Sequence, residues 1–327
     1  MPYLFFSSTP LNKLFSTPHS FCELLEAKFL LKSNTHKTLL SLDSIIQNLY
    51  FRPLKSIRMI IIMNTEFLAF YFLLAFTGQF ISWKFPFREQ TENKEKLWDC
   101  LAILSGRVFA IGYIALIGAP AFLLLTHETA LVQWREIVES WNPIYAGIAQ
   151  FLLIDFLLYW AHRSMHHQRL WNVHAFHHSP KHLWWGAGLR ASPIHMLMNS
   201  IPYTLAAVMF PTPEGALITA IALFLDIANQ HWIHSNIKVP FAKYIEWIFV
   251  TPRLHFVHHS KKREFSDSNY GFVFSFWDRF FGTLTNPEKV SDNEVIGLNY
   301  NNTNARLFWG VGPKVKLKAP QAEQAME

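Results

Sequence analysis

The run DFLLYWAHRSMHHQRLWNVHAFHHSP, residues 155–180, carries histidines at helical spacing. Positions i, i+3 and i+4 of an α-helix lie on one face, so each motif is predicted to aim its imidazoles at one point. Imidazole is the commonest metal-ligating side chain, and it suits iron, zinc, copper and nickel. The run therefore predicts a metal site. Its two motifs, H-x-x-x-H and H-x-x-H-H, consist of His162, His166, His174, His177 and His178.

Two later segments add to this set. RLHFVHHS, residues 253–260, repeats the H-x-x-H-H motif, and NQHWIHSN, residues 229–236, contains two more histidines. Eight or more convergent imidazoles are too many for one ion, so we expect two metal ions side by side. The further candidate ligands are His231, His234, His255, His258 and His259.

The composition is typical of a membrane protein. Hydrophobic residues make up 51% of the chain and aromatic residues 16%, whereas charged residues make up only 16%, against about 25% in soluble domains. The net charge of +6 is explained by Lys and Arg gathered in cytoplasmic loops, and no nucleic-acid-binding motif is present. Two cysteines exclude a disulfide scaffold and a four-cysteine iron–sulfur site.

Apolar runs predict the membrane-spanning segments. Three are expected to cross, and two shorter ones flank the turn PTPEG as a hairpin that either crosses or re-enters the membrane. Positive charge follows the first and third spans, which places these loops and every histidine motif on the cytoplasmic side. The expected spans are residues 67–83, 108–126 and 143–160, and the hairpin arms are residues 194–210 and 216–230.

The expected fold is all-α, an integral-membrane helical bundle with a cytosolic histidine-rich helical cap. Residues 1–62 are either a targeting segment or an extension upstream of a natural start at Met59 or Met63, and we favour the second interpretation. The remaining expected regions are N-terminal transmembrane helices over 63–142, a catalytic domain over 143–287 and a polar tail over 288–327.

Over about residues 145–287 the chain resembles the fatty acid hydroxylase/sterol desaturase superfamily. The resemblance lies in the three histidine segments and in NYGFVFSFWDRFFGT, residues 269–283. Within the superfamily, YWAHR, WIHSN and NYG…WDRFFGT look most similar to the alkylglycerol monooxygenase and bacterial sterol-desaturase-like branch. The resemblance implies a membrane non-haem di-iron oxygenase whose ligands are His162, His166, His174, His177, His178, His234, His255, His258 and His259.

One position departs from the superfamily pattern. Relatives often place Gln or His four residues before the histidine that matches His234, where this chain has Gln230 followed by His231. Both share a helix face with His234, so His231 remains a candidate ligand, and the alternative is a solvated histidine at a helix end. His195 lies outside the motifs, and we expect a structural or substrate-contacting role for it. His167 is expected to point away from His166.

Carboxylates are expected to orient the ligands. Asp155 lies two helical turns before His162 inside an apolar span, where an acid is costly and is a functional hypothesis by default. It is predicted to accept the second N–H of a ligand histidine. The alternative role for such residues is a helix cap or an ion pair with a nearby arginine. Further candidates for orienting ligands are Asp226, Asp267, Asn269 and Asp278.

The chemistry expected of such a site is O2-dependent hydroxylation or desaturation of a lipid by two iron ions, although zinc can occupy the same ligands in a preparation. The sequence contains no nicotinamide, flavin or nucleotide motif, so electrons are expected from a cytochrome- or ferredoxin-type partner or a small reductant. The branch resemblance implies a reduced pterin as the electron donor.

The alternatives to an oxygenase are a zinc-dependent membrane hydrolase, which the missing H-E-x-x-H motif disfavours, and a non-catalytic metal-binding membrane protein. The sequence gives no indication of oligomeric state.

Overall fold

All described residues belong to one compact unit of the chain, residues 71–327. Within them every regular element is a helix, and strand pairing is limited to isolated bridges. The all-α character expected from the sequence is confirmed for this part of the chain. The computed structural model describes residues 72–73, 75–88, 96–125, 129–210, 212–291 and 293–312.

The described helices divide into a set of longer runs and a set of short elements. A helix occupies residues 75–84. The long helices are α4 (Lys96–Tyr113), the π-helix η3 (Ile114–Gly118), α5 (Ala119–Leu125), α6 (Thr129–Glu139), α7 (Pro143–Met165), α9 (Pro193–Met209) and α10 (Pro213–Ile233). The short elements are α8 (Trp171–His174), η4 (Trp185–Leu189), α11 (Ala242–Ile245), α12 (Pro252–His258), α13 (Arg263–Ser266), α14 (Phe276–Phe280), η5 (Pro287–Lys289) and α15 (Asn304–Phe308).

Four of these helices, α7, α9, α10 and α12, begin with the same two-residue signal. A polar side chain caps the first turn by accepting a backbone N–H, and a proline follows at the first helical position, where its missing N–H costs nothing. This local signal sets the residue at which each helix begins. It therefore also sets the direction in which the histidines of that helix point. The caps are Asn142, Ser192, Thr212 and Thr251.

Two helices are long and apolar enough to cross a membrane, by length and composition: Lys96–Leu125 and Pro143–Met165. The first starts earlier than the expected residue 108, and Pro120 does not end it. Proline lacks an N–H, and its ring crowds the carbonyl four residues back. The π-helical turn Ile114–Gly118 lies at that point and rearranges the local hydrogen bonds, so the helix continues. Of the expected first span, 67–83, the part before residue 72 lies outside the described residues.

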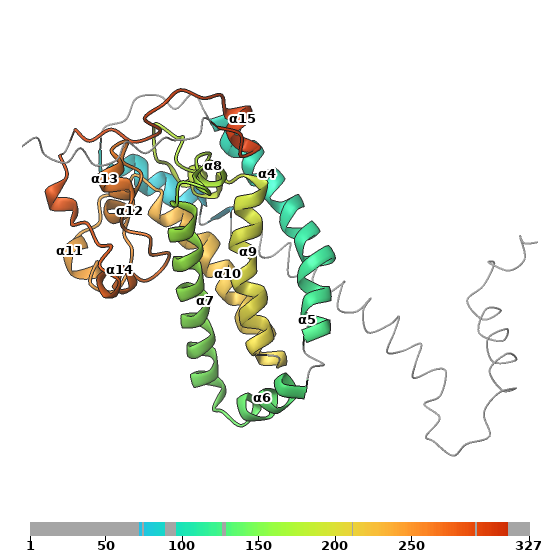
Figure 1. Ribbon diagram of the computed structural model, residues 1–327. Coiled ribbons are helices and arrows are strands. Elements are labelled where there is room, and N and C mark those ends of the chain that lie inside the picture. The colour runs from blue at the N-terminus through green and yellow to red at the C-terminus, as the bar shows by residue number, and fades with distance from the viewer. Residues whose placement is uncertain are drawn as a thin grey trace, which may run out of the picture. The chain divides into compact units, whose positions relative to one another are not determined.

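The long helices lie side by side. α7 packs against both α9 and α10, and α4 packs against α9. In Figure 1, α6 lies at one end of these helices, and α8, α12, α13 and α15 lie at the other. A buried cluster of Ile154, Leu158, Ala206, Ala222 and Phe272 joins α7, α9 and α10 to the segment after α13.

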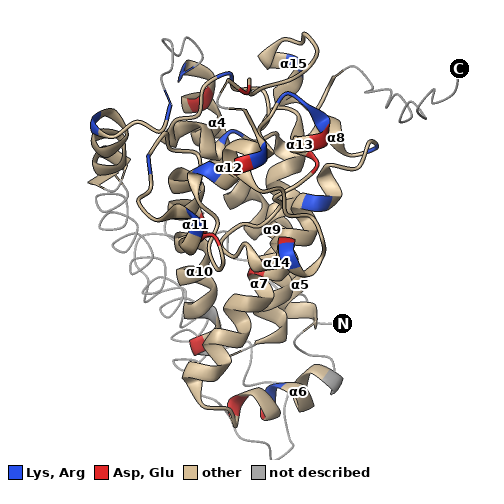
Figure 2. Cartoon of the chain, turned by 90° about the vertical axis from the view of Figure 1, so that its left-hand side faces the viewer, with Lys and Arg blue, Asp and Glu red and all other residues tan. Residues whose placement is uncertain are grey.

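Charged side chains lie mainly at the two ends of the long helices. Figure 2 shows Lys, Arg, Asp and Glu gathered around the short helices and again on α6, with few of them between. α9 contains no Asp, Glu, Lys or Arg. Large apolar residues of η3 and α5 are exposed, such as Leu116 at 79% and Leu124 at 72%. Such surface is unfavourable in water and suits contact with lipid.

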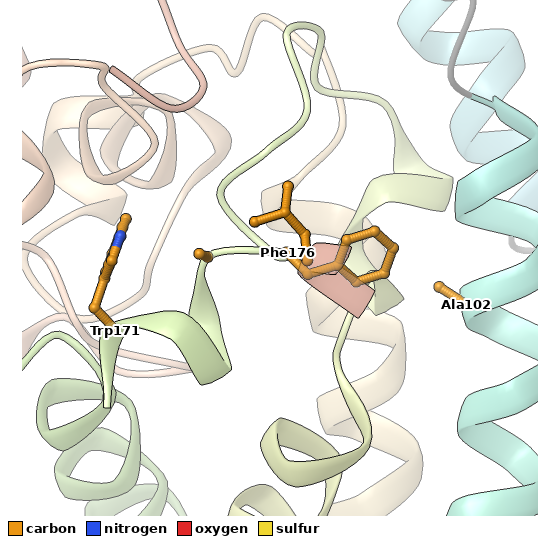
Figure 3. Packing of buried hydrophobic residues seen from close by; sticks show 5 residues of the cluster. Ala102, Trp171 and Phe176 are labelled. Atoms are coloured by element: carbon orange, nitrogen blue, oxygen red, sulfur yellow. The ribbon is translucent and has the colours of Figure 1, made fainter. Parts of the chain in front are cut away.

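Residues beyond 288 pack onto the histidine-bearing half, although the sequence predicted a polar tail there. Leu307 of α15 is buried in a cluster with Ala102 of α4, Trp171 of α8 and Phe176, which follows α8. Figure 3 shows the last three of these side chains. Glu294 accepts a hydrogen bond of 2.7 Å from Ser260 and pairs with Lys262 at 3.0 Å. Apolar burial and paired charge hold this segment in place, at least as far as residue 312. Residues 313–327 lie outside the described part.

Candidate metal centre

Helix ends bring nine histidines together. His162 lies in the last turn of α7, and His166 and His234 are the C-terminal caps of α7 and α10. The nine form two groups, and within each group the candidate ligand atoms lie within 4.8 Å of one another. The five-histidine group consists of His162, His166, His174, His178 and His258. The four-histidine group consists of His177, His234, His255 and His259.

Each H-x-x-H-H motif contributes to both groups. His174 and His178 join one group while His177 joins the other, and the second motif divides in the same way. At 100° per residue, positions i and i+4 are about 40° apart, whereas i+3 lies about 60° to the other side of i. The expectation that each motif aims at a single point is therefore corrected, because each motif helps to form two adjacent sites. The rings of His178 and His259, one from each group, stack with centroids 4.5 Å apart.

The four-histidine group has the spacing of ligands around one ion. The Nε2 atoms of His234, His255 and His259 form a triangle with sides of 3.0, 3.0 and 3.1 Å, and Nε2 of His177 lies 3.3 Å from that of His234. Hydrogen bonds cannot satisfy three mutually adjacent ring nitrogens, because each N–H points at one acceptor. Nitrogens about 2.1 Å from one ion and at right angles to each other lie about 3.0 Å apart. The triangle fits a shared metal ion.

The five-histidine group leaves ring nitrogens that only an ion would satisfy. His162 Nε2 and His174 Nε2 are 3.0 Å apart. The Nε2 atoms of His166, His178 and His258 are buried without a hydrogen-bond partner among the described residues. An unsatisfied buried nitrogen costs free energy, so three of them in one place indicate a ligand.

The rings are uncharged, as metal ligation requires. Burial lowers the pKa of His174, His177 and His178 well below its usual value, and positive charge on neighbouring histidines would lower it further. Burial likewise lowers the pKa of His255 and His258. Neutral imidazole offers a lone pair to a metal, and the donor set of nine imidazoles suits iron or zinc.

Backbone carbonyls orient four of the nine rings. Nδ1 of His162 donates to the Tyr270 carbonyl at 2.8 Å, and Nδ1 of His258 donates to the Ser268 carbonyl at 2.7 Å. In the four-histidine group, His177 donates to the Arg190 carbonyl at 3.1 Å and His234 to the Gln230 carbonyl at 2.7 Å. These bonds protonate Nδ1 and leave the Nε2 lone pair directed into the group. A side chain plays this part for His166, whose Nδ1 lies 3.2 Å from Asp267 Oδ1.

Asp155 stabilises the loop around Val273 by hydrogen bonds and does not contact a ligand histidine. Its oxygens accept from the Val273 and Phe274 amides and from Trp277 Nε1, at 2.9 to 3.3 Å. The expected contact with His162 is therefore corrected: the ring of His162 faces the Tyr270 carbonyl, and Asp155 secures the loop that carries this carbonyl.

Asp278 and Asn269 brace the same region. Asp278 accepts from the Tyr270 and Gly271 amides, each at 2.8 Å, and burial raises its pKa to about 6, so it is ionised at neutral pH. Asn269 has a φ of +54° and donates to the Leu254 carbonyl inside α12 at 3.1 Å. Asn tolerates this left-handed conformation better than most residues. Neither side chain contacts a ligand ring directly.

Three other candidates lie outside both groups. His231 turns away from them, with Nδ1 2.6 Å from the Trp185 carbonyl. Asp226 accepts from Gln230 Nε2 at 3.4 Å and not from a ligand histidine. His195 is buried with its ring 4.7 Å from that of His174, which suits the structural or substrate-contacting role expected for it.

A buried ion pair that no sequence motif indicated lies beside the four-histidine group. Arg190, whose carbonyl orients His177, pairs with Asp99 of α4 at 3.4 Å, and both side chains are fully buried. Trp184 Nε1 donates to the same carboxylate at 2.6 Å. The neighbouring Gly188 packs on α10 so closely that a Cβ atom would lie 2.3 Å from the Gln230 carbonyl, which orients His234. The η4 segment thus connects α4 to the four-histidine group.

A cavity of about 480 Å³ opens onto both groups. Its wall includes His162 and His174 from the five-histidine group and His177 and His255 from the four-histidine group. The rest is mostly apolar and comes from the helices α4, α5, α9 and α10 and the turn η3 between them. The volume falls in the range of small-molecule sites.

Comparison with known proteins identifies the histidine-bearing segment. Residues 147–283 match the family model for fatty acid hydroxylase. Human alkylglycerol monooxygenase is 31% identical over 168 residues, which is 51% of this chain and 36% of that protein. The ornithine lipid hydroxylase of Rhizobium tropici is 31% identical over 166 residues, 48% of this chain and 47% of that protein.

The name of a third relative refers to a sterol. Human lathosterol oxidase is 32% identical over 191 residues, 55% of this chain and 59% of that protein. The chain thus spans between about a third and three fifths of the length of these relatives. No solved structure matches the chain significantly.

Proposed function

We propose, from the match of residues 147–283 to the family model for fatty acid hydroxylase, that the protein is a membrane-bound non-haem di-iron oxidoreductase. It uses O2 to hydroxylate or desaturate a lipid. The relatives are named as a monooxygenase, a hydroxylase and an oxidase of lipids, which supports an oxidative reaction on a lipid in this chain as well.

The observation that carries the proposal is the cavity shared by the two histidine groups. An apolar pocket bordered by His162, His174, His177 and His255 brings a hydrocarbon chain against both candidate metal sites at once. Carbon chains present no acid, base or leaving group, so a site that binds one beside metal ligands is suited to attack on C–H bonds.

Each histidine group would hold one iron. The pair supplies, when bound, the O2 activation that side chains lack. The chain itself contributes oriented ligands, since four backbone carbonyls and Asp267 orient five of the nine rings. Its apolar cavity wall excludes water from the reacting carbon. Electrons come from outside, from a cytochrome- or ferredoxin-type partner or from a reduced pterin.

We further propose that the protein crosses the membrane several times, with the metal centre at the cytoplasmic face. The charge distribution supports this, because the basic residues at the histidine end include the exposed Arg169, Lys181 and Lys261. Arg190 does not belong in the count of positive residues that orient a membrane protein, since it is buried against Asp99.

The test is oxygen consumption by the purified membrane protein with lipid extracts and a reductant. We expect consumption that depends on lipid and stops on iron removal. No consumption with any lipid pool would contradict the oxygenase proposal. Product formation without oxygen would favour the zinc hydrolase instead, and reversible metal release without any product would favour a non-catalytic metal-binding protein.

No acid belongs to either described histidine group, which disfavours hydrolysis because that reaction generally uses a general base beside the metal.

A further inference from the structure

Polar side chains interrupt the apolar cavity along two facing helices. On α9, His195, Asn199 and Tyr203 follow one another at intervals of four residues and all line the cavity. On α10, Asp226 and Gln230 do the same. Residues four apart share a helix face, so each helix presents one polar stripe to the same space.

The other polar residues of the wall make their hydrogen bonds within the protein, and so do two groups of the stripes: Asn199 Nδ2 lies 3.2 Å from His195 Nε2, and Gln230 Nε2 donates to Asp226. Ser200 Oγ donates to the Met196 carbonyl at 2.7 Å, and Thr204 Oγ1 lies 2.7 Å from Tyr113 Oη. By contrast, Asn199 Oδ1 and Tyr203 Oη are buried and make no hydrogen bond of good geometry among the described residues. The stripes therefore keep hydrogen-bonding capacity free for a ligand.

Among the described residues that line the cavity, Asp226 is the single acidic one and none is Lys or Arg. Its one hydrogen bond of good geometry comes from Gln230 Nε2 at a long 3.4 Å, and the Tyr203 hydroxyl lies close enough to interact with it. A carboxylate in apolar surroundings is costly unless it receives hydrogen bonds. This carboxylate still has room to accept one from a bound molecule.

We propose that Asp226, with Tyr203 and Gln230 beside it, binds a hydroxyl group on the lipid substrate. The site offers an acceptor in the carboxylate and donors in the phenol and the amide. A hydroxyl can donate to the carboxylate and accept from the phenol or from the second N–H of the amide, whereas an ammonium can only donate. This inference rests on the proposed function, since it assigns the class of lipid that the same cavity receives.

The position of Asp226 also determines which carbon reacts. Asp226 lies eight residues before His234, a rise of about 12 Å along α10. A lipid held by its hydroxyl at Asp226 therefore presents to the histidine groups a carbon several bonds along the chain. Asp226 is thus a specificity-determining residue, remote from the reacting carbon.

Binding of matched probes tests this assignment. Decan-1-ol, its methyl ether and decylamine are titrated into the purified full-length protein in detergent, and each dissociation constant is measured calorimetrically. The ether keeps an acceptor oxygen and loses the donor. A hydrogen bond to a charged group predicts that the alcohol binds about tenfold or more tightly than the ether.

Variants test which side chain causes the preference for the alcohol over the ether. Asp226→Leu is expected to bring the alcohol-to-ether ratio to about one. Asp226→Asn, which keeps the shape of the side chain, is expected to reduce the ratio to a few-fold. Ser200→Ala is the matched control on the same wall, because its hydroxyl is already bonded within α9, and it is expected to keep the wild-type ratio.

Three results would overturn the assignment: equal binding of alcohol and ether by the wild type, tighter binding of the amine than of the alcohol, or no binding of any probe. Oxygen consumption with lipid extracts is measured on the same samples. An alcohol preference without oxygen consumption would contradict the proposed function alone. Oxygen consumption without an alcohol preference would contradict the hydroxyl site alone.

Discussion

The two histidine groups touch each other but are held by different parts of the chain. Carbonyls of Tyr270 and Ser268 orient the five-histidine group, and their loop is fastened by Asp155 and Asp278. The four-histidine group is oriented by the carbonyls of Arg190 and Gln230, which lie directly after η4 and on α10.

The difference shows that the centre depends on structure outside the matched family segment. The loop that braces the five-histidine group lies within residues 147–283, whereas the four-histidine group relies on Asp99 of α4, which precedes that segment. A substitution in the residues that support one group is therefore expected to affect that group and to leave the other group intact.

Removal of a ligand is expected to have the largest effect. His162→Ala affects the five-histidine group and His255→Ala the four-histidine group, and each variant is expected to lower the metal content per chain. Activity is expected to fall by more than about 100-fold, since mutation of the outer partners of metal ligands already costs about 10–100-fold. Elemental analysis and oxygen consumption measure both effects.

The control for ligand removal is His167→Ala, because His167 is exposed beside His166 and belongs to neither group. This variant is expected to keep its metal and its activity. Equal losses in the His167 and His162 variants would contradict the ligand assignment.

Breaking the buried ion pair is expected to have the next largest effect. Arg190→Met leaves the Asp99 carboxylate buried and unpaired, at a cost of about 3–5 kcal/mol in the free energy of unfolding. The double variant with Asp99→Leu is expected to recover most of this stability. Denaturant unfolding in detergent measures it, and a single variant as stable as the wild type would show that the pair does not support η4.

Asp278→Asn is expected to weaken the five-histidine group alone. The amide keeps the size of the side chain but replaces one of the two acceptor oxygens with an N–H donor, so either the Tyr270 or the Gly271 amide loses its acceptor and the carbonyl that orients His162 shifts. Metal affinity of this group is expected to fall by about 10–100-fold. Glu288→Gln, which removes the same charge at an exposed site, is the control in the metal titration. Equal weakening of both groups would contradict their separate bracing.

The smallest effect is expected at His231. His231→Gln retains a donor for the Trp185 carbonyl, and the ring lies outside both groups. Metal content is expected to stay at the wild-type value, with activity within about twofold, because no ligand is removed. Loss of one ion per chain in this variant would make His231 a ligand after all.

Much of the arrangement could be predicted from spacing. The motifs that contain His162, His174 and His255 indicated the helices and the convergence of their rings, since side-chain direction follows from 3.6 residues per turn. The division of the rings between two groups could not be predicted, because it depends on how α8 and α12 face each other. This orientation is a tertiary property.

The supports of the ligands were harder to predict. Backbone carbonyls such as that of Tyr270 carry no side-chain signal, so the sequence suggested carboxylates in their place. The pairing of Asp99 with Arg190 joins residues 91 positions apart, and nothing local marks it. The cap-and-proline starts of α9 and α12 were by contrast readable from Ser192–Pro193 and Thr251–Pro252.

The most direct test of the account is Mössbauer spectroscopy of protein expressed with ⁵⁷Fe, together with iron quantification per chain. Two adjacent groups that each bind an ion predict two irons per chain with magnetically coupled spins. The His162→Ala and His255→Ala variants are expected to lose that coupling. A single iron per chain, or two irons without coupling in the wild-type protein, would contradict a centre built from both histidine groups.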